Sequence, residues 1–272
     1  MRDAWHVAGR RPRVAVHKFS SCDGCQLAFL NAGADLLRLA DQVELVHFLE
    51  AGLDAPDATV DLAFVEGSIS TPEDLERIRT IRERSALLVA IGACAIAGGL
   101  QALRNRADAP AWLAGVYPRP EWLSVLETST PVSAHVPVDW DVPGCPVSTA
   151  QVTAVVRALA LGVAPRPVDQ KQCLDCKHRG LTCVVVARGE ACLGPVTAAG
   201  CGALCPGQGR GCYGCYGPAE APNTAALGRR LRADGLAPEQ IARRFTHINN
   251  NAPAFAEAAD ALLDKLDKKD SP

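Results

Sequence analysis

Apolar and polar segments alternate through the first 165 residues of the chain. Short runs of apolar and β-branched residues predict buried strands, and apolar residues at helical spacing separate them. The expected strands are Val14–Phe19, Val43–Phe48, Asp61–Val65 and Ala86–Ile91. The expected helices are Gln26–Leu39, Pro72–Arg84, Ala95–Arg106 and Thr149–Leu161. This alternation predicts an α/β fold, with an open parallel sheet covered by helices on both faces.

The pattern changes after this region. Prolines at 165 and 167 interrupt it, because a helix cannot continue through them. Gln170–Pro218 then holds eight cysteines and many glycines with little periodicity, and only Cys183–Ala187 has the pattern of a strand. A segment this irregular buries too little apolar surface to order itself, so a bound group must hold it. We therefore expect two domains, residues 1–165 and 166–272.

Helical periodicity returns from Pro222 onward. We expect one apolar stripe in this region to pack in a core. Its members are Phe255, Ala258, Leu262, Leu263 and Leu266. A tail rich in Lys and Asp follows, and we expect it to be solvated.

Charge and hydropathy argue against several classes of function and location. The 272 residues include 28 basic and 30 acidic ones, a balance that gives no reason to expect binding to nucleic acid or to an anionic membrane. The longest apolar stretch, Ala86–Leu100, is shorter than the about 20 residues that span a bilayer. Arg10 and Arg11 lack the apolar region of an export signal. We expect a cytoplasmic protein, in which disulfides are rare, so metal binding is the leading explanation for the 12 cysteines.

Four cysteines belong to the predicted sheet domain. Cys22 and Cys25 follow one expected strand, and Cys94 follows another. Because the carboxyl ends of parallel strands meet at one edge, residues distant in sequence can gather there. Cys145, between a glycine and a proline, completes a site of four thiolates. An alternative stays open: Cys22-x-x-Cys25 also fits a thioredoxin-type redox pair, with the other two cysteines buried as small apolar residues.

The other eight cysteines lie within 43 residues and make two sites of four. They are Cys173, Cys176, Cys183, Cys192, Cys201, Cys205, Cys212 and Cys215. Zinc takes four thiolates and suits paired Cys-x-x-Cys motifs. Iron–sulfur clusters take the same ligands at looser spacing, and Cys205-Pro206 is similar to the end of a ferredoxin motif. The spacing alone favours iron only slightly.

Several motifs together resemble one family. The motifs are Cys22-Asp-Gly-Cys25, Val65-Glu66-Gly67-Ser68, Gly92-Ala93-Cys94 and Pro143-Gly144-Cys145-Pro146, followed by the cysteine-rich segment. With them the chain resembles the small subunit of nickel–iron hydrogenases. More narrowly, it is similar to the delta subunit of cytosolic, NAD(P)-linked sulfhydrogenases. The resemblance covers roughly residues 12–218.

The resemblance implies a flavodoxin-like sheet domain, followed by an irregular cysteine-rich iron–sulfur domain with C-terminal helices. It implies three 4Fe–4S clusters. The proximal cluster would be held by Cys22, Cys25, Cys94 and Cys145. The middle cluster would be held by Cys201, Cys205, Cys212 and Cys215. The distal cluster would be held by Cys173, Cys176, Cys183 and Cys192.

Some positions depart from the better-known membrane-bound members. Where those have a His ligand, this chain has Cys173, and we expect the nearby His178 to be a surface residue. Where those have a Pro that leaves a three-iron cluster, this chain has Cys205, so four irons are expected. The resemblance places Glu66 near the proximal cluster, with a tuning or proton role. The other interpretation of Glu66 is a cap for the helix that begins near Thr71.

The function implied by the resemblance is electron transfer in a hydrogenase, an oxidoreductase acting on H2. Electrons would pass between the nickel–iron site of a separate large subunit and an NAD(P)-linked flavin or iron–sulfur partner. The catalytic site would lie on the large subunit, so this chain would have no catalytic residues. Three alternatives remain: a complex-I-like subunit of the 20 kDa type, a zinc-stabilised binding module and a thiol–disulfide enzyme. The complex-I-like family has adjacent cysteines at its first ligand position, whereas two residues separate Cys22 from Cys25.

Overall fold

The computed structural model describes residues 10–166 and 170–267, with the side chains of 265–267 outside that description. The chain divides into two compact units, Met1–Arg166 and Pro167–Pro272. We call them the sheet unit and the cysteine unit, and each is described by itself. Among the described residues, no helix combines the length and the apolar character needed to cross a membrane.

A five-stranded parallel sheet forms the centre of the sheet unit. Its strands are β1 Arg13–Lys18, β2 Glu44–Phe48, β3 Val60–Glu66, β4 Ser85–Ile91 and β5 Trp140–Val142. They lie in the order β2-β1-β3-β4-β5. This is the strand order of flavodoxin-like sheets, and the direction of winding switches between β1 and β3. The expected parallel sheet is confirmed, and β5 is an addition that the sequence pattern did not predict.

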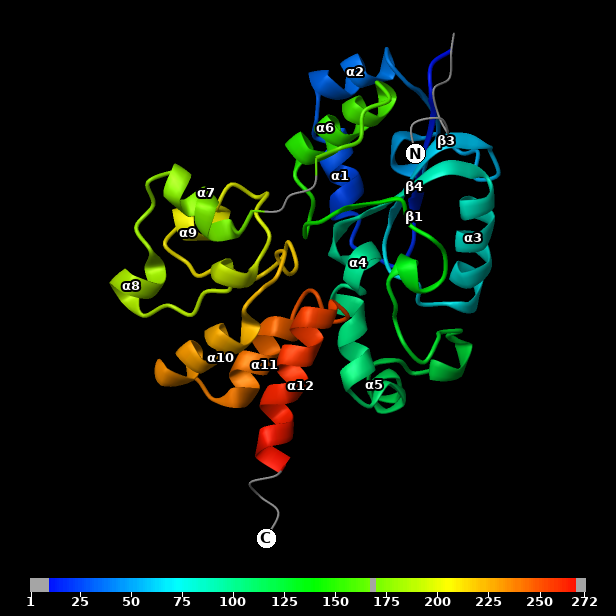
Figure 1. Ribbon diagram of the computed structural model, residues 1–272. Helices are drawn as coiled ribbons and strands as arrows, with labels where there is room; N and C mark the ends of the chain where they lie inside the picture. Colours follow the sequence, from blue (N-terminus) through cyan, green and yellow to red (C-terminus); the bar gives the residue numbers. More distant parts are fainter. Residues whose placement is uncertain (1–9, 167–169, 268–272) are drawn as a thin grey trace. The chain divides into compact units, whose positions relative to one another are not determined.

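Apolar layers cover both faces of this sheet. Helices lie over each of the two faces (Figure 1). The helices are α1 Gly24–Leu30, α2 Ala34–Ala40 and α6 Thr149–Ala160 on one face and α3 Pro72–Glu83 on the other. On the first face the ring of Phe29 packs edge-on against Phe64, with centroids 5.2 Å apart. On the second face Ile78 and Ile81 of α3 are buried. The strand β3 is buried along its whole length, as expected for a central parallel strand.

Glycines end two of the expected helices early. The predicted helix Gln26–Leu39 is two helices, α1 and α2, because the backbone of Gly33 has a φ of 54°. The predicted helix Ala95–Arg106 is also divided. It consists of α4 Gly92–Ala97 and the 3₁₀ helix η2 Leu100–Arg106, and the two glycines between them have φ angles of 77° and 62°. In both places the apolar pattern continues through the glycines, whereas the helix does not.

The start of α3 has the capping box that the sequence predicts. The Thr71 hydroxyl accepts a hydrogen bond from the Asp74 backbone N–H at 3.1 Å, and the Asp74 carboxylate accepts one from the Thr71 backbone N–H at 3.0 Å. Shorter elements complete the unit. They are η1 Leu49–Ala51, α5 Ala109–Val116, η3 Pro120–Trp122 and η4 Val132–Ala134.

The cysteine unit consists of short helices joined by turns, followed by three longer helices. The short ones are α7 Gln172–His178, α8 Val184–Arg188, η5 Gly194–Val196 and α9 Leu204–Gly207. The expected strand at Cys183–Ala187 is wrong, because α8 forms there and ends at Gly189, whose φ is 65°. A five-residue apolar run fits either element, and no neighbouring strand pairs with it among the described residues.

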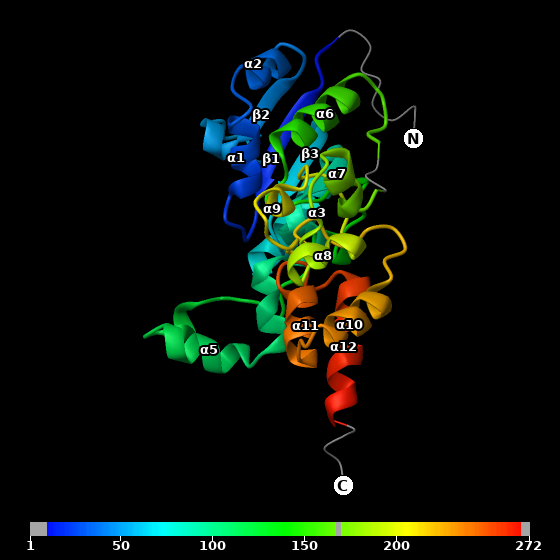
Figure 2. The ribbon, with the colours of Figure 1, turned by 90° about the vertical axis from the view of Figure 1, so that its left-hand side faces the viewer.

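The three longer helices are α10 Thr224–Ala233, α11 Pro238–Thr246 and α12 Pro253–Asp267, which lie side by side (Figure 2). Phe245 of α11 and Phe255 of α12 are buried with their rings 5.5 Å apart. The other stripe residues Ala258, Leu262 and Leu263 are half-buried, and the side chain of Leu266 lies outside the described residues. The apolar stripe is therefore part of a helical core.

Two histidines stack inside the sheet unit. His17 of β1 is 4% exposed, and its ring centroid lies 4.7 Å from that of His47. Burial, the charge of His47 and the charge of Arg77 lower the pKa of His17 to about 3. The folded state therefore keeps His17 neutral at a pH where the unfolded chain binds a proton.

We expect the sheet unit to lose stability as the pH falls from about 6.5 toward 3, because only the unfolded state is protonated in this window. For His17 alone the loss is about 2 kcal/mol between pH 7 and pH 5. His17→Gln should make the pH dependence shallower in anaerobic urea unfolding. His178→Gln, at an exposed position, is the control. An unchanged pH dependence in His17→Gln would contradict the assignment.

Candidate metal centres

Four cysteines gather where the strands of the sheet end. Cys22 and Cys25 follow β1, Cys94 lies in α4 after β4, and Cys145 follows β5. Cys25 interacts electrostatically with Cys94 and Cys145. Cys94 also interacts with Cys145 and Cys22. The structure thus brings together the four cysteines predicted for this edge, at the switch point where open α/β sheets bind ligands.

Glycines let the backbone approach these sulfurs. A Cβ atom added to Gly92 would overlap the Cys25 Sγ, and one added to Gly99 would lie 2.5 Å from the Cys94 Sγ. Both glycines have positive φ angles, 83° and 62°. The space beside the sulfurs is therefore kept free of side chains, as a site for a bulky inorganic group requires.

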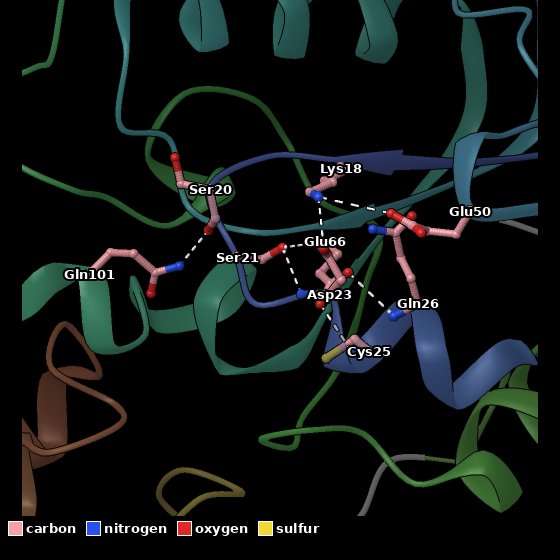
Figure 3. A network of polar contacts seen from close by, with 9 residues as sticks. All are labelled: Lys18, Ser20, Ser21, Asp23, Cys25, Gln26, Glu50, Glu66 and Gln101. Carbon is pink, nitrogen blue, oxygen red and sulfur yellow. Dashed lines mark hydrogen bonds and ion pairs between the residues drawn. The ribbon is translucent and has the colours of Figure 1, made fainter. Parts of the chain in front are cut away.

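Glu66 occupies the same edge at the end of β3 and is 2% exposed. Its Oε1 accepts a hydrogen bond from the Cys25 backbone N–H at 3.0 Å, and its Oε2 accepts one from the Gln26 N–H at 3.3 Å (Figure 3). Burial raises the pKa of Glu66, and these two hydrogen bonds act in the opposite direction. The interpretation of Glu66 as a cap for the helix at Thr71 is wrong, because Asp74 has that role. Glu66 instead fixes the first turn of α1.

Lys18 lies beside this carboxylate network. Its Nζ is 2.7 Å from the Asp23 carboxylate and 3.9 Å from that of Glu50 (Figure 3). On the other side of the cysteine loop, the Gln101 amide donates to the Ser20 carbonyl, and its Oε1 is 3.5 Å from the Cys94 Sγ. The sequence did not single out Gln101, because its position seven residues after Cys94 becomes meaningful only once the glycines reverse the chain.

The thiols of this edge are costly to ionise without a positive partner. Burial and neighbouring sulfurs raise the pKa of Cys94 to about 11, although the hydrogen bond with Gln101 opposes this. Burial also raises the pKa values of Cys25 and Cys145. Metal binding removes these protons, and the positive charge of the metal compensates the thiolates. The donor set therefore fits a thiophilic metal centre.

The cysteine unit gathers a second set of sulfurs. Cys173 interacts electrostatically with Cys192, Cys176 and Cys183, the set predicted for one site. Burial and these neighbours raise the pKa of Cys173 to about 11. His178, close to them in sequence, is exposed, as expected.

The remaining sulfurs form two adjacent pairs. Cys205 interacts with Cys201, and Cys212 interacts with Cys215. Cys192 interacts with both Cys205 and Cys212, so it lies between this set and the preceding one. The Cys192 Sγ also accepts hydrogen bonds from the backbone N–H groups of Gly194 at 3.4 Å and Cys212 at 3.2 Å. Backbone donors of this kind stabilise thiolate ligands.

The spacing of the sulfurs bears on the type of metal centre. All 12 cysteines are free of disulfides. Among the described residues, no three His, Cys, Asp or Glu side chains converge closely enough to hold a single metal ion. Four thiolates are the donor set of zinc sites and of 4Fe–4S clusters alike.

The comparisons with known proteins agree on one family. Residues 22–159 match the family described as NADH ubiquinone oxidoreductase, 20 Kd subunit. The chain is 36% identical over 234 residues to the sulfhydrogenase 2 subunit delta of Pyrococcus furiosus, which covers 86% of this chain and 97% of that protein. It is 28% identical to the NAD-reducing hydrogenase HoxS subunit delta of Cupriavidus necator, over 58% of this chain and 81% of that one.

A solved structure supports the same relationship. The crystal structure of an NAD+-reducing [NiFe]-hydrogenase in the H2-reduced state contains a chain that is 29% identical, with a TM-score of 0.54. The match covers 58% of this chain and 96% of that chain, so the present protein has a further part without a counterpart there. The protein belongs to the NADH ubiquinone oxidoreductase 20 Kd subunit family, and within it to the small, delta-type subunits of nickel–iron hydrogenases. The resemblance carried by the sequence motifs is confirmed.

The glycines beside the sulfurs generate a prediction. Gly92→Ala or Gly99→Ala should remove about a third of the bound metal, because four of the 12 cysteines gather at this edge and a Cβ would displace one of their sulfurs. Gly115→Ala is the matched control, since that glycine has open space around it. Metal content of the purified chains is the measurement. Full metal content in both site variants would contradict the geometry.

Proposed function

We propose that this subunit relays electrons through three 4Fe–4S clusters in a hydrogenase complex that oxidises H2 reversibly. One end of the relay faces the nickel–iron site of a large subunit, and the other faces an NAD(P)-linked flavin or iron–sulfur partner. The observation that carries the proposal is the convergence of four cysteines from three segments at the carboxyl ends of the sheet strands, with glycines leaving space beside the sulfurs.

Interactions between the sulfurs support the proximal and distal ligand sets, and the middle set takes the two remaining pairs. The proximal cluster is bound by Cys22, Cys25, Cys94 and Cys145. The distal cluster is bound by Cys173, Cys176, Cys183 and Cys192. The middle cluster is bound by Cys201, Cys205, Cys212 and Cys215. The match to the sulfhydrogenase delta subunit covers 86% of the chain and must therefore extend into the cysteine unit, which supports clusters in both units.

The chain's own residues position the electron carriers and set their charge environment. When bound, the clusters accept and release single electrons, within a potential range of about −700 to +450 mV. Cys173 supplies an additional thiolate to the distal cluster and Cys205 supplies one to the middle cluster, and the added negative charge lowers the reduction potential of each. No side chain of this subunit is proposed as an acid, base or nucleophile, because the nickel–iron chemistry belongs to the large subunit.

Exposed apolar side chains support the proposal that a partner chain binds this subunit. Trp112 and Trp122 are 56% and 75% exposed, and Val116 is 71% exposed. Figure 2 shows α5, which carries two of them, standing away from the sheet. Large apolar residues gathered on a protein surface mark interaction sites.

A cytoplasmic location of the complex is supported by the 12 cysteines free of disulfides.

We further propose that Glu66 positions the proximal cluster and lowers its potential through its charge. Glu66→Gln keeps an acceptor for the backbone N–H groups at the start of α1 but removes a buried negative charge. The midpoint potential of the proximal cluster should therefore rise in this variant. The measurement is an anaerobic redox titration followed by electron paramagnetic resonance. Glu50→Gln, which removes a half-exposed carboxylate of the same network, should change it far less. Equal shifts in both variants would exclude a specific effect of Glu66.

Metal analysis and spectroscopy of the purified subunit test the main proposal. We expect about twelve irons per chain and broad visible absorption, whereas a colourless protein that contains zinc would contradict the proposal.

Cys205→Pro should convert the middle cluster to a three-iron centre, visible by electron paramagnetic resonance, and leave the other two clusters as they are. A four-iron middle cluster in this variant would mean that the ligand sets are divided differently.

Cys94→Ser should abolish the proximal cluster, whereas a thiol–disulfide enzyme would keep its activity.

A further inference from the structure

A cavity of about 640 Å³ lies within the cysteine unit. One wall is formed by Arg188, the last residue of α8, by the chain from Gly189 to Ala191 and by Leu193. The other wall is formed by residues of α11, with Leu236 before this helix and His247 after it. Tyr213, which lies between Cys212 and Cys215 in sequence, also lines it. The volume lies in the range of about 300–1,000 Å³ that is typical of small-molecule sites.

The side chains around this cavity are strongly basic. Arg188 faces it from one wall, and Arg243 and Arg244 face it from the other, together with His247. Glu190 is the acidic residue of the lining. In the part of the chain that the structure describes, no carboxylate forms an ion pair with any of the three arginines. With three arginines and one glutamate in its lining, the cavity keeps an excess of positive charge.

Hydrogen bonds hold two of the arginines while leaving donors free. The Arg188 Nη1 donates to the Gly209 carbonyl at 3.1 Å, and the Arg243 Nε donates to the Glu239 carbonyl at 3.2 Å. A guanidinium has five N–H donors, so each can still bind an anion in a bidentate manner. Arginines fixed in this way are suited to the planar oxygen pairs of phosphate groups.

We propose that this cavity binds a diphosphate group, with Arg188 on one side of it and Arg243 and Arg244 on the other. A nucleoside diphosphate and inorganic pyrophosphate share this chemistry. Tyr213 is 43% exposed, and its ring lines the same cavity as the apolar side chains of Leu193 and Leu236, so a nucleoside can pack there. A compact anion is favoured over an acidic protein segment because the three arginines come from two separate helices, α8 and α11, and line the same cavity.

The site has a direct connection to the sulfur chemistry of this unit. Ala191 and Leu193 line the cavity, and Cys192 lies between them. An anion bound there adds negative charge close to a cluster ligand, which lowers the potential of that cluster. Binding itself does not depend on the electron-transfer role and can be measured without hydrogenase activity.

Isothermal titration calorimetry of the anaerobically purified full chain tests the proposal, with ADP, sodium pyrophosphate and adenosine as probes. We expect one saturable site for ADP and for pyrophosphate, and none for adenosine. The double variant Arg243→Gln/Arg244→Gln should weaken the binding of both anions by about tenfold or more. Arg188→Gln is a second variant on the other wall and should weaken both as well. Tyr213→Ala should weaken only ADP, which separates a nucleotide from the bare anion.

The control is Arg229→Gln/Arg232→Gln, which removes the same charge from exposed positions on α10. It should bind both anions as the wild type does, and unchanged iron content and circular dichroism show that each variant is folded. Absence of saturable binding to the wild type would overturn the proposal, as would an equal loss in the control. Displacement of ADP at lower concentration by an Asp- and Glu-rich peptide would overturn it in favour of an acidic protein segment.

Discussion

The parallel direction of the strands is the constraint on which the first candidate metal centre depends. Because every strand ends at the same edge, residues from distant segments meet there, and the switch between β1 and β3 opens a place for a ligand. Register matters as much as direction. Glu66 pairs with Lys18 across β1 and β3, and a slip of one residue would turn the carboxylate to the other face of the sheet. The hydrogen bonds to Cys25 and Gln26 would then be lost.

The two units achieve order by different physical means. The sheet unit has two apolar layers, one on each face, that form a core of its own. Around the cysteine-rich loops, the buried apolar cluster is small, with Val184 packed against Cys192 and Cys212. Two of its three members are therefore also proposed ligands. Metal bound by these sulfurs would therefore add directly to the stability of this segment.

The sequence predicted the parallel sheet and the gathering of four cysteines at its edge, and the reasons for this also explain which features it did not predict. Buried parallel strands are continuous apolar runs, and cysteine is rare enough that its spacing is informative. A break such as that at Gly33 was missed because the apolar periodicity continues across it. The strand β5 has three residues, too few to form a pattern. The run at Cys183–Ala187 was assigned to the wrong element because it suits a helix equally well. The contact of Glu66 with α1 is set by tertiary structure, so no local pattern could reveal it.

The unequal sources of order have a consequence for the lifetime of the protein in a cell. A newly made chain that has not received its metal would carry a folded sheet joined to loosely held cysteine loops. Proteases cut such loops without having to open the sheet, so incomplete molecules can be removed selectively. Loading of the sulfurs would then act as a checkpoint between synthesis and assembly, since it protects the same stretch, 170–218, that degradation would attack first.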